Sequence, residues 1–300
     1  MKPELATKLW NFLWQDYKAR VSYAQTYQQM IHAVGGTIAN DHIAFRSLRL
    51  VIHTPQGEIN FGINHLEKIA IALGYEVAGE YTFAATHLYA RHYHHPQQAE
   101  FDLPKLFISE LIVEELPTHI AQLIHQTVTQ ISDGMISTFN AENNIALITQ
   151  TFPQIFTRPW QPPLRSVVEQ VNTVSQYGAW VLLHGYAVNH FTGYINRQNT
   201  SQYPDIDTTV RALANLGIPM KAEIEGNVSC GLRQTATQAV TEMVTVLDDQ
   251  SKQAIQIPWT YAYYELAQRY IVEVEPGKPQ LFDAFLGKNA QQLFEMTKPR

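Results

Sequence analysis

The chain has 300 residues, of which 45% are hydrophobic and 16% charged, so it can bury a sizeable core as one large domain or two fused modules. This composition is that of an ordinary globular protein and argues against disorder. The net charge of −6 and the absence of a Lys/Arg-rich run argue against a nucleic-acid partner.

The sequence shows no sign of export or of membrane insertion. No apolar run reaches the roughly 20 residues that a membrane span needs. The first residues lack the uninterrupted apolar core and cleavage site of a signal peptide. Cys230 is the only cysteine, which excludes an internal disulfide and fits a reducing compartment. We therefore expect a cytoplasmic protein without a membrane partner.

The first half of the chain predicts a helix, a strand pair, a second helix and three further strands. Apolar residues recur with helical spacing near the N-terminus, at Leu5, Leu9, Trp10, Leu13 and Trp14. Strands around His42 and at 50–54 are followed by the turn PQGEINFG and by a helix that ends at Gly74. Strands are then expected at 76–84, 87–94 and 105–116, and Pro117 opens a helix that runs to Ile131.

The second half repeats this order. Residues 179–195 form a strand-rich run that carries His190, a helix is expected at 205–220, and later strands are expected at 221–227, 230–236 and 259–274. Both helices end in Leu-Gly, a match that chance could also produce. We predict an α+β fold of two βαβββ-like modules, 1–156 and 173–300 with a C-terminal tail, joined by the Pro-rich connection 157–172 into one integrated catalytic domain.

Two histidines and a glutamate in this pattern could hold a metal ion. Alternation along the first strand places His42, Ala44 and Arg46 on one face. His190 holds the corresponding place in the second module, and Glu265 lies in the last predicted strand. Buried carboxylates are rare unless they are paired or bind a metal. Two histidines and one carboxylate on separate strands form the facial triad that leaves three positions open on non-haem Fe(II).

Five motifs in order resemble the 2-oxoadipate dioxygenase/decarboxylase family of the vicinal oxygen chelate superfamily: DHIAFR, FISEL, VNHFTG, GLRQTA and YYELAQR. The resemblance runs from about residue 41 to residue 273. It implies a curved sheet around a metal cavity with outer helices, and an Fe(II) site of His42, His190 and Glu265. It also implies that Arg46 is the catalytic residue that binds a substrate carboxylate, and that Gln234 is a second substrate-binding residue.

The function that the resemblance implies is a non-haem iron dioxygenase and decarboxylase. Its substrates would be O2 and a 2-oxo dicarboxylic acid, with 2-oxoadipate converted to 2-hydroxyglutarate and CO2 in lysine breakdown. The alternatives are a vicinal-oxygen-chelate protein that binds a metal and a ligand without redox chemistry, and a Zn(II) or Ni(II) lyase of glyoxalase type. The sequence leaves the oligomeric state open.

Several residues compete for these roles. His184 has the same parity as His190 in one predicted strand, and Glu110 is the first-module counterpart of Glu265. A salt bridge between Arg46 and an acid at the edge of the core, such as Glu110, is the structural alternative to substrate binding. His92 and His94 form an alternating pair near a proline, where we expect them to be exposed.

Overall fold

The computed structural model describes residues 2–55, 57–131, 145–275 and 277–285. Gln56 of the PQGEINFG segment and residues 286–300 of the expected C-terminal tail lie outside the described residues. The helices are α1 (Lys2–Arg20), α2 (Ser22–Ala33), α3 (Ile63–Ala72), α4 (Gln98–Phe101), α5 (Thr118–Val128), α7 (Ile145–Ile155), α8 (Arg165–Val174), α9 (Gln176–His184) and α10 (Ile206–Asn215).

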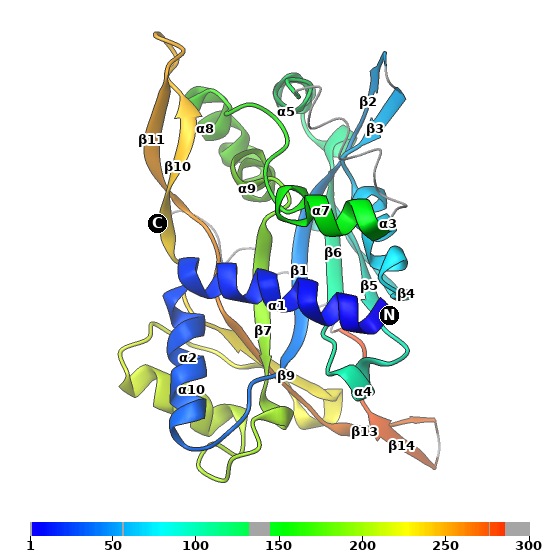
Figure 1. The fold of residues 1–300 in the computed structure, drawn as a ribbon. Coiled ribbons are helices and arrows are strands. Elements are labelled where there is room, and N and C mark those ends of the chain that lie inside the picture. Colours follow the sequence, from blue (N-terminus) through cyan, green and yellow to red (C-terminus); the bar gives the residue numbers. More distant parts are fainter. Residues whose placement is uncertain (1, 56, 132–144, 276, 286–300) are drawn as a thin grey trace.

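The main sheet is built from β1 (Asn40–Arg49), β4 (Glu76–Phe83), β5 (Leu88–His94), β6 (Lys105–Ile112), β7 (Val188–Tyr194), β8 (Glu225–Asn227), β9 (Leu232–Ala236) and β12 (Glu265–Arg269). Three hairpins lie outside it: β2 (Val51–Thr54) with β3 (Gly57–Asn60), β10 (Thr241–Leu247) with β11 (Ala254–Thr260), and β13 (Ile271–Glu275) with β14 (Lys278–Leu281). Figure 1 shows β10 and β11 projecting from one end of the molecule. None of the helices in the described part of the chain has the length and apolarity of a membrane span.

The strand order β4-β5-β6-β1-β7-β12-β9-β8 contains two copies of one plan. Strands β1 and β7 pair antiparallel at the centre of the sheet. Each is flanked by the last strand of its own module, in parallel: β6 beside β1 and β12 beside β7. In chain order the modules are β1-α3-β4-β5-β6 and β7-α10-β8-β9-β12, so the prediction of paired βαβββ modules is confirmed.

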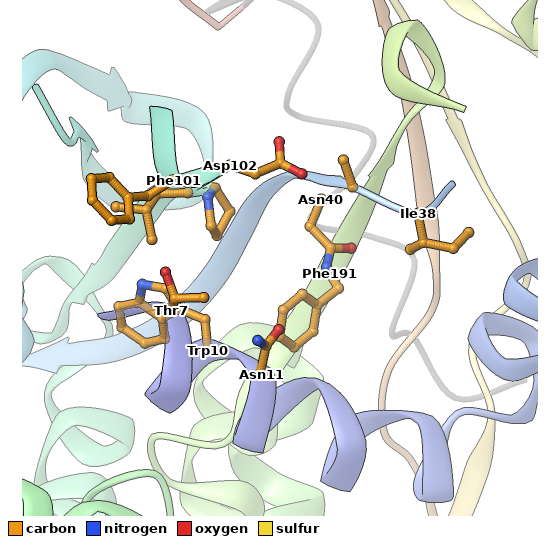
Figure 2. Close-up of a pocket in the computed structure, with 11 residues that line it drawn as sticks. Thr7, Trp10, Asn11, Ile38, Asn40, Phe101, Asp102 and Phe191 are labelled. Carbon is orange, nitrogen blue, oxygen red and sulfur yellow. The ribbon is translucent and has the colours of Figure 1, made fainter. Parts of the chain in front are cut away.

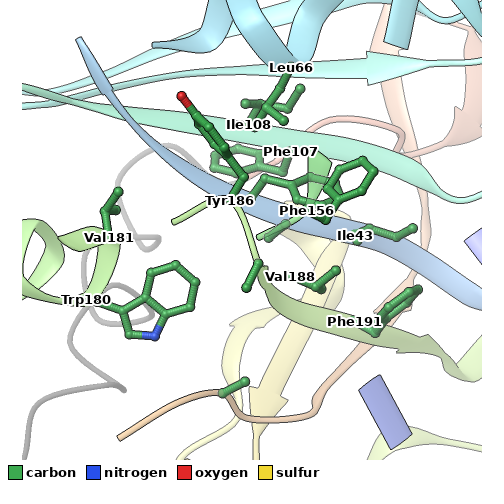
Figure 3. Close-up of a cluster of buried hydrophobic side chains, with 14 of the residues drawn as sticks. Ile43, Leu66, Phe107, Ile108, Phe156, Trp180, Val181, Tyr186, Val188 and Phe191 are labelled. Atoms are coloured by element: carbon green, nitrogen blue, oxygen red, sulfur yellow. The ribbon is translucent and has the colours of Figure 1, made fainter. Parts of the chain in front are cut away.

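Helices cover one face of the central strands. In Figure 1, α1 crosses in front of β1 and β7. The Trp14 and Tyr17 rings of α1 each lie 5.1 Å, centroid to centroid, from the ring of Phe191 in β7. Figure 3 shows Ile43, Val188 and Phe191 of the central strands within this buried apolar cluster. Phe191 and its register partner Ile43 therefore lie on the face that α1 covers, which leaves the alternate residues for the opposite face.

One strand prediction is wrong, because residues 179–184 belong to helix α9 rather than to a strand. The segment AWVLLH is buried on all sides, so it lacks the polar face that would reveal a helix. The backbone N–H of Gly178 donates to Ser175 Oγ, which caps the helix before the apolar run begins. His184 therefore does not share a strand face with His190.

The prediction of one continuous strand at 259–274 is also wrong. Strand β11 ends at Thr260, β12 begins only at Glu265, and β13 follows a break at Tyr270. Tyr261 and Tyr263 thus lie in the connection before β12, although aromatic residues favour strands. The sequence analysis also missed the β10–β11 hairpin, helix α2, and strand β3 within the predicted turn.

We predict that Phe191→Ala lowers the free energy of unfolding by about 3 to 5 kcal/mol, because it leaves a cavity among aromatic rings under α1. Phe191 is 1% exposed, whereas Phe12 of helix α1 is 49% exposed and serves as the control. Urea titrations of both alanine variants provide the test. A loss from Phe12→Ala as large as that from Phe191→Ala would contradict this account of the core.

Candidate metal centre and active site

The register of the central strands brings three sequence-distant side chains into one row. His42 of β1 lies opposite Thr192 of β7, and Thr192 lies opposite Glu265 of β12. His190 lies two residues before Thr192 and opposite Ala44. Residues that face each other across strands share a face of the sheet, so His42, His190 and Glu265 emerge on the face away from α1.

Their ligand atoms converge on one point. His190 Nε2 lies 2.9 Å from Glu265 Oε2, and His42 Nε2 lies 3.5 Å from the same oxygen. The two Nε2 atoms are 3.3 Å apart. His42 is 4% exposed, His190 7% and Glu265 0%. Among the described residues, these three form a group of possible ligands whose atoms lie within 4.8 Å of one another.

Hydrogen bonds at the far side of each imidazole fix which nitrogen faces the centre. His42 Nδ1 lies 2.9 Å from Asp41 Oδ2, and His190 Nδ1 lies 3.0 Å from Asn189 Oδ1. A carboxylate or an amide oxygen can only accept, so each Nδ1 carries the proton and donates it. In the neutral form of each ring, Nε2 then presents a lone pair toward the centre, which is the state that a metal ligand requires.

Charge in this buried cluster is unevenly distributed. Burial alone would raise the pKa of Glu265, but His190 and His42 outweigh it and lower the pKa to about 2. Burial lowers the pKa of His190, and the charge of Glu265 offsets this only in part. For His42, burial opposes protonation, but hydrogen bonds to Asp41 and Glu265 outweigh it and raise the pKa. Glu265 is therefore an anion at neutral pH, although it has no contact with solvent.

The residues fit a divalent metal ion. Two imidazole lone pairs and a carboxylate oxygen converge, and Thr192 Oγ1 is a hydrogen-bond donor among them, 3.1 Å from Glu265 Oε2. Glu265 Oε1 is buried and has no hydrogen-bond partner among the described residues. Such an atom is costly to bury in the absence of a cation or donor. A set of two nitrogens and one carboxylate is typical of non-haem iron, and zinc can also use it.

Arg46 lies on the same strand face, one side chain beyond Ala44. It is 1% exposed, and its guanidinium carbon is 4.8 Å from the ring centroid of Tyr177 and 5.1 Å from that of Trp180. Burial lowers its pKa, with partial compensation by neighbouring tyrosines. Glu110, the acid considered for a salt bridge with Arg46, has other partners: its Oε1 lies 2.6 Å from Arg49 Nε, and its Oε2 accepts from the backbone N–H of Ile63.

Gln234 also lies on this face. It is buried and sits opposite Ala267, two residues along β9 from Ala236, which is opposite Glu265. The structure therefore brings the three predicted ligands and both predicted substrate-binding residues to one face. It places the competing residues elsewhere: Glu110 caps α3, and His184 ends α9 with its Nδ1 3.3 Å from Glu242 Oε1.

The sequence model of the 2-oxoadipate dioxygenase/decarboxylase family matches residues 5–298. This chain belongs to that family. The 2-oxoadipate dioxygenase/decarboxylase of Arabidopsis thaliana, described as chloroplastic, is 28% identical over 275 residues, which cover 86% of this chain and 67% of the relative. The Oryza sativa protein, described as chloroplastic/amyloplastic, is 26% identical over 299 residues, which cover 94% of this chain and 75% of the relative.

A solved structure shares the fold of this family member. The hydroxyglutarate synthase of Oryza sativa, crystallised in complex with 2-oxoadipate, superposes with a TM-score of 0.79 at 22% identity. The alignment covers 99% of this chain and 93% of that one. At this level of identity the match establishes the shared fold alone.

Sequence reasoning missed the residues that support the ligands in this family member. Asp41 and Asn189 each precede a histidine directly, and this repeated acceptor-histidine pair was a signal available in the sequence. Arg269 donates to both oxygens of Asp41 from four residues beyond Glu265. The expectation that His92 is exposed is wrong, because His92 is buried and its Nδ1 lies 2.9 Å from the hydroxyl of Tyr81.

A separate cavity of about 180 Å³ lies on the α1 side of the sheet. Figure 2 shows the side chain of Asn40 pointing toward Asn11 and Thr7 of α1, beside Phe191. Because Phe191 belongs to the helix-covered face, this cavity is distinct from the metal centre, and its neutral polar lining offers no metal-binding group other than Asp102.

We predict that replacing His42, His190 or Glu265 by Ala abolishes tight binding of a divalent metal, because a two-ligand remnant competes poorly with water. Metal content after anaerobic loading and desalting measures this. Glu110→Ala and His184→Ala serve as controls and should keep full occupancy. Retention of metal by Glu265→Ala together with its loss from Glu110→Ala would refute the carboxylate assignment.

Proposed function

We propose that this chain is an Fe(II)-dependent dioxygenase that decarboxylates 2-oxoadipate to 2-hydroxyglutarate. One 2-oxoadipate and one O2 yield one 2-hydroxyglutarate and one CO2, so the reaction balances without an external reductant. The observation that carries the proposal is the convergence of His42, His190 and Glu265 on the face that also holds Arg46, in a member of this family. Lysine breakdown is the proposed physiological setting.

Iron held by these three residues would supply Lewis-acid and redox chemistry for a 2-oxo acid and O2, since a facial triad leaves neighbouring positions open. The chain's own contribution is geometric. Asp41 and Asn189 hold both imidazoles with Nε2 inward, and Tyr263 stacks on His190 with ring centroids 4.8 Å apart. Orientation by such partners keeps the ligands in place before the substrate arrives.

Arg46 would bind a substrate carboxylate. It follows His42 by four residues in the same strand, roughly 13 Å along the backbone, which a long side chain and a six-carbon substrate can bridge. Tyr177 and Trp180 lie against the guanidinium and limit its orientations. A planar guanidinium can pair with a carboxylate through two parallel hydrogen bonds. Gln234 would donate a further hydrogen bond from β9.

Exclusion of water also follows from the side chains around the centre. The ring of Phe285 packs edge-on against His42, with centroids 4.8 Å apart, and the three ligands are almost completely buried. A site without water strengthens the pairing between Arg46 and a carboxylate, and it limits side reactions during the reaction with O2. We also propose a cytoplasmic location, which the free and exposed Cys230 supports.

Oxygen uptake by the iron-loaded protein tests the function. We expect 2-oxoadipate to trigger O2 consumption, with CO2 and 2-hydroxyglutarate formed in equal amounts, and we expect weaker responses from 2-oxo acids of other lengths between four and seven carbons. A non-redox binding protein would bind these acids without consuming O2. A lyase of glyoxalase type would turn over anaerobically with Zn(II) or Ni(II), and either result would overturn the proposal.

Arg46→Ala should keep its iron and lose activity on 2-oxoadipate by roughly 30-fold to several thousand-fold, the cost of truncating one member of a buried charge pair. Arg46→Lys should recover only part of the loss, because an ammonium group lacks the planar fork. Arg49→Ala is the matched control, since Arg49 lies on the same strand, is partly exposed and pairs with Glu110.

A six-carbon 2-oxo acid without the distal carboxylate shows which end Arg46 binds. If Arg46 binds the distal carboxylate, this analogue is poor with the wild type and changes little in Arg46→Ala. If it binds the carboxylate beside the metal, the variant loses both substrates alike. Unchanged oxygen uptake in Arg46→Ala would remove Arg46 from the site.

A further inference from the structure

One buried guanidinium, that of Arg269, connects two different parts of the metal centre. Its Nε donates to Asp41 Oδ1 at 2.5 Å and its Nη2 donates to Asp41 Oδ2 at 2.8 Å. Its Nη1 donates to the backbone carbonyls of Phe282 at 3.0 Å and Ala284 at 2.9 Å. Both side chains of the ion pair are fully buried, so its hydrogen bonds are shielded from water.

The first part is Asp41, through which Arg269 affects the orientation of His42. Asp41 accepts from Arg269 through both carboxylate oxygens and also accepts from His42 Nδ1. Because Arg269 donates to both oxygens, it determines where the carboxylate of Asp41 lies. The direction of the His42 lone pair depends on this arrangement.

The second part is the segment 282–285, which we name the C-terminal strap. Its Phe285 ring lies 4.8 Å from the His42 ring, 5.0 Å from Phe107 and 5.2 Å from His92, centroid to centroid. The backbone N–H of Phe285 donates to the hydroxyl of Tyr81, and Asp283 pairs with Lys105 at 2.6 Å. The strap therefore forms one wall of the metal centre.

We propose that Arg269 is a positioning residue that both orients His42 through Asp41 and holds the C-terminal strap over the metal centre. This inference deepens the proposed function and rests on it for the role of the strap. An ammonium group cannot replace the guanidinium, because four hydrogen bonds to Asp41 and two carbonyls require donors in a planar fork. A purely structural ion pair would affect stability without affecting metal affinity or the fate of oxygen.

Different variants test the two roles of Arg269 one at a time. Asp41→Asn disturbs the orientation of His42 and leaves the strap carbonyls in place, whereas Phe285→Ala opens the wall and leaves Asp41 in place. Arg269→Lys disturbs both. Arg233→Lys is the control, because Arg233 forms a similar fork to Asp207, at 2.5 and 2.9 Å, on the partly exposed side of β9.

Metal affinity of the purified apo-protein is measured by competition between Co(II) binding and a chromophoric chelator, which requires no turnover. Arg269→Lys and Asp41→Asn should weaken binding by about 10 to 100-fold, as is typical when a partner of a metal-binding histidine is altered. Phe285→Ala and Arg233→Lys should stay close to the wild type. The double variant Asp41→Asn with Arg269→Lys should lose no more than the larger single loss, because both act through one hydrogen bond to His42.

Two measurements report on the C-terminal strap: the rate of chymotrypsin cleavage after Phe282 or Phe285, and the amount of 2-hydroxyglutarate formed per O2 consumed. Arg269→Lys should be cleaved several-fold faster, and both Arg269→Lys and Phe285→Ala should form less product per O2, whereas Asp41→Asn should keep the wild-type ratio. Wild-type Co(II) affinity in Arg269→Lys, or wild-type cleavage rate, would overturn the proposal. Absence of O2 uptake in the wild type would instead overturn the proposed function, while the Co(II) and cleavage measurements would still test Arg269.

Discussion

The antiparallel pairing of β1 with β7 is the constraint on which the rest of the site depends. Its register sets His42 opposite Thr192 and Ala44 opposite His190, so both imidazoles emerge on the same face. A shift of one residue would turn every side chain of a strand to the other face. The histidines would then point into the apolar layer under α1, and the core residues Ile43 and Phe191 would lie on the face that now holds the three candidate ligands.

The two faces of these strands therefore have opposite requirements. On one face, aromatic residues of α1 and the central strands exclude water and supply the stability of the fold. On the other, a carboxylate, two imidazoles and the Arg269–Asp41 pair are buried together. Burying these groups is costly unless each is matched. The apolar layer offsets that cost. Three atoms that could bind a metal converge here, and a bound cation would balance the charge of Glu265.

The two modules build the candidate metal centre from the same pair of residues. Each module contributes a first strand with an acceptor directly before a histidine, Asp41 with His42 and Asn189 with His190. The modules then diverge: β12 adds Glu265 and Arg269, whereas Glu110 of β6 pairs with Ser47 of β1 in the register and binds Arg49 and the start of α3. One module thus carries Glu265, and the other carries Arg46, which we propose binds the substrate.

The sequence by itself determined the two-module plan, since period-two alternation and helix ends at glycine are local signals. Its five ordered motifs also identified the candidate site residues His42, His190, Glu265, Arg46 and Gln234. It did not determine the structure of residues 179–184, because a helix buried on all sides has no polar face to distinguish it from a buried strand. Only the tertiary structure decided between Glu265 and Glu110 as neighbours of the histidines, because strand register and the partner Arg49 are long-range features. It alone brought Arg269 to Asp41 across 228 residues of chain and seated Phe285 on His42, since such contacts depend on packing rather than on local pattern.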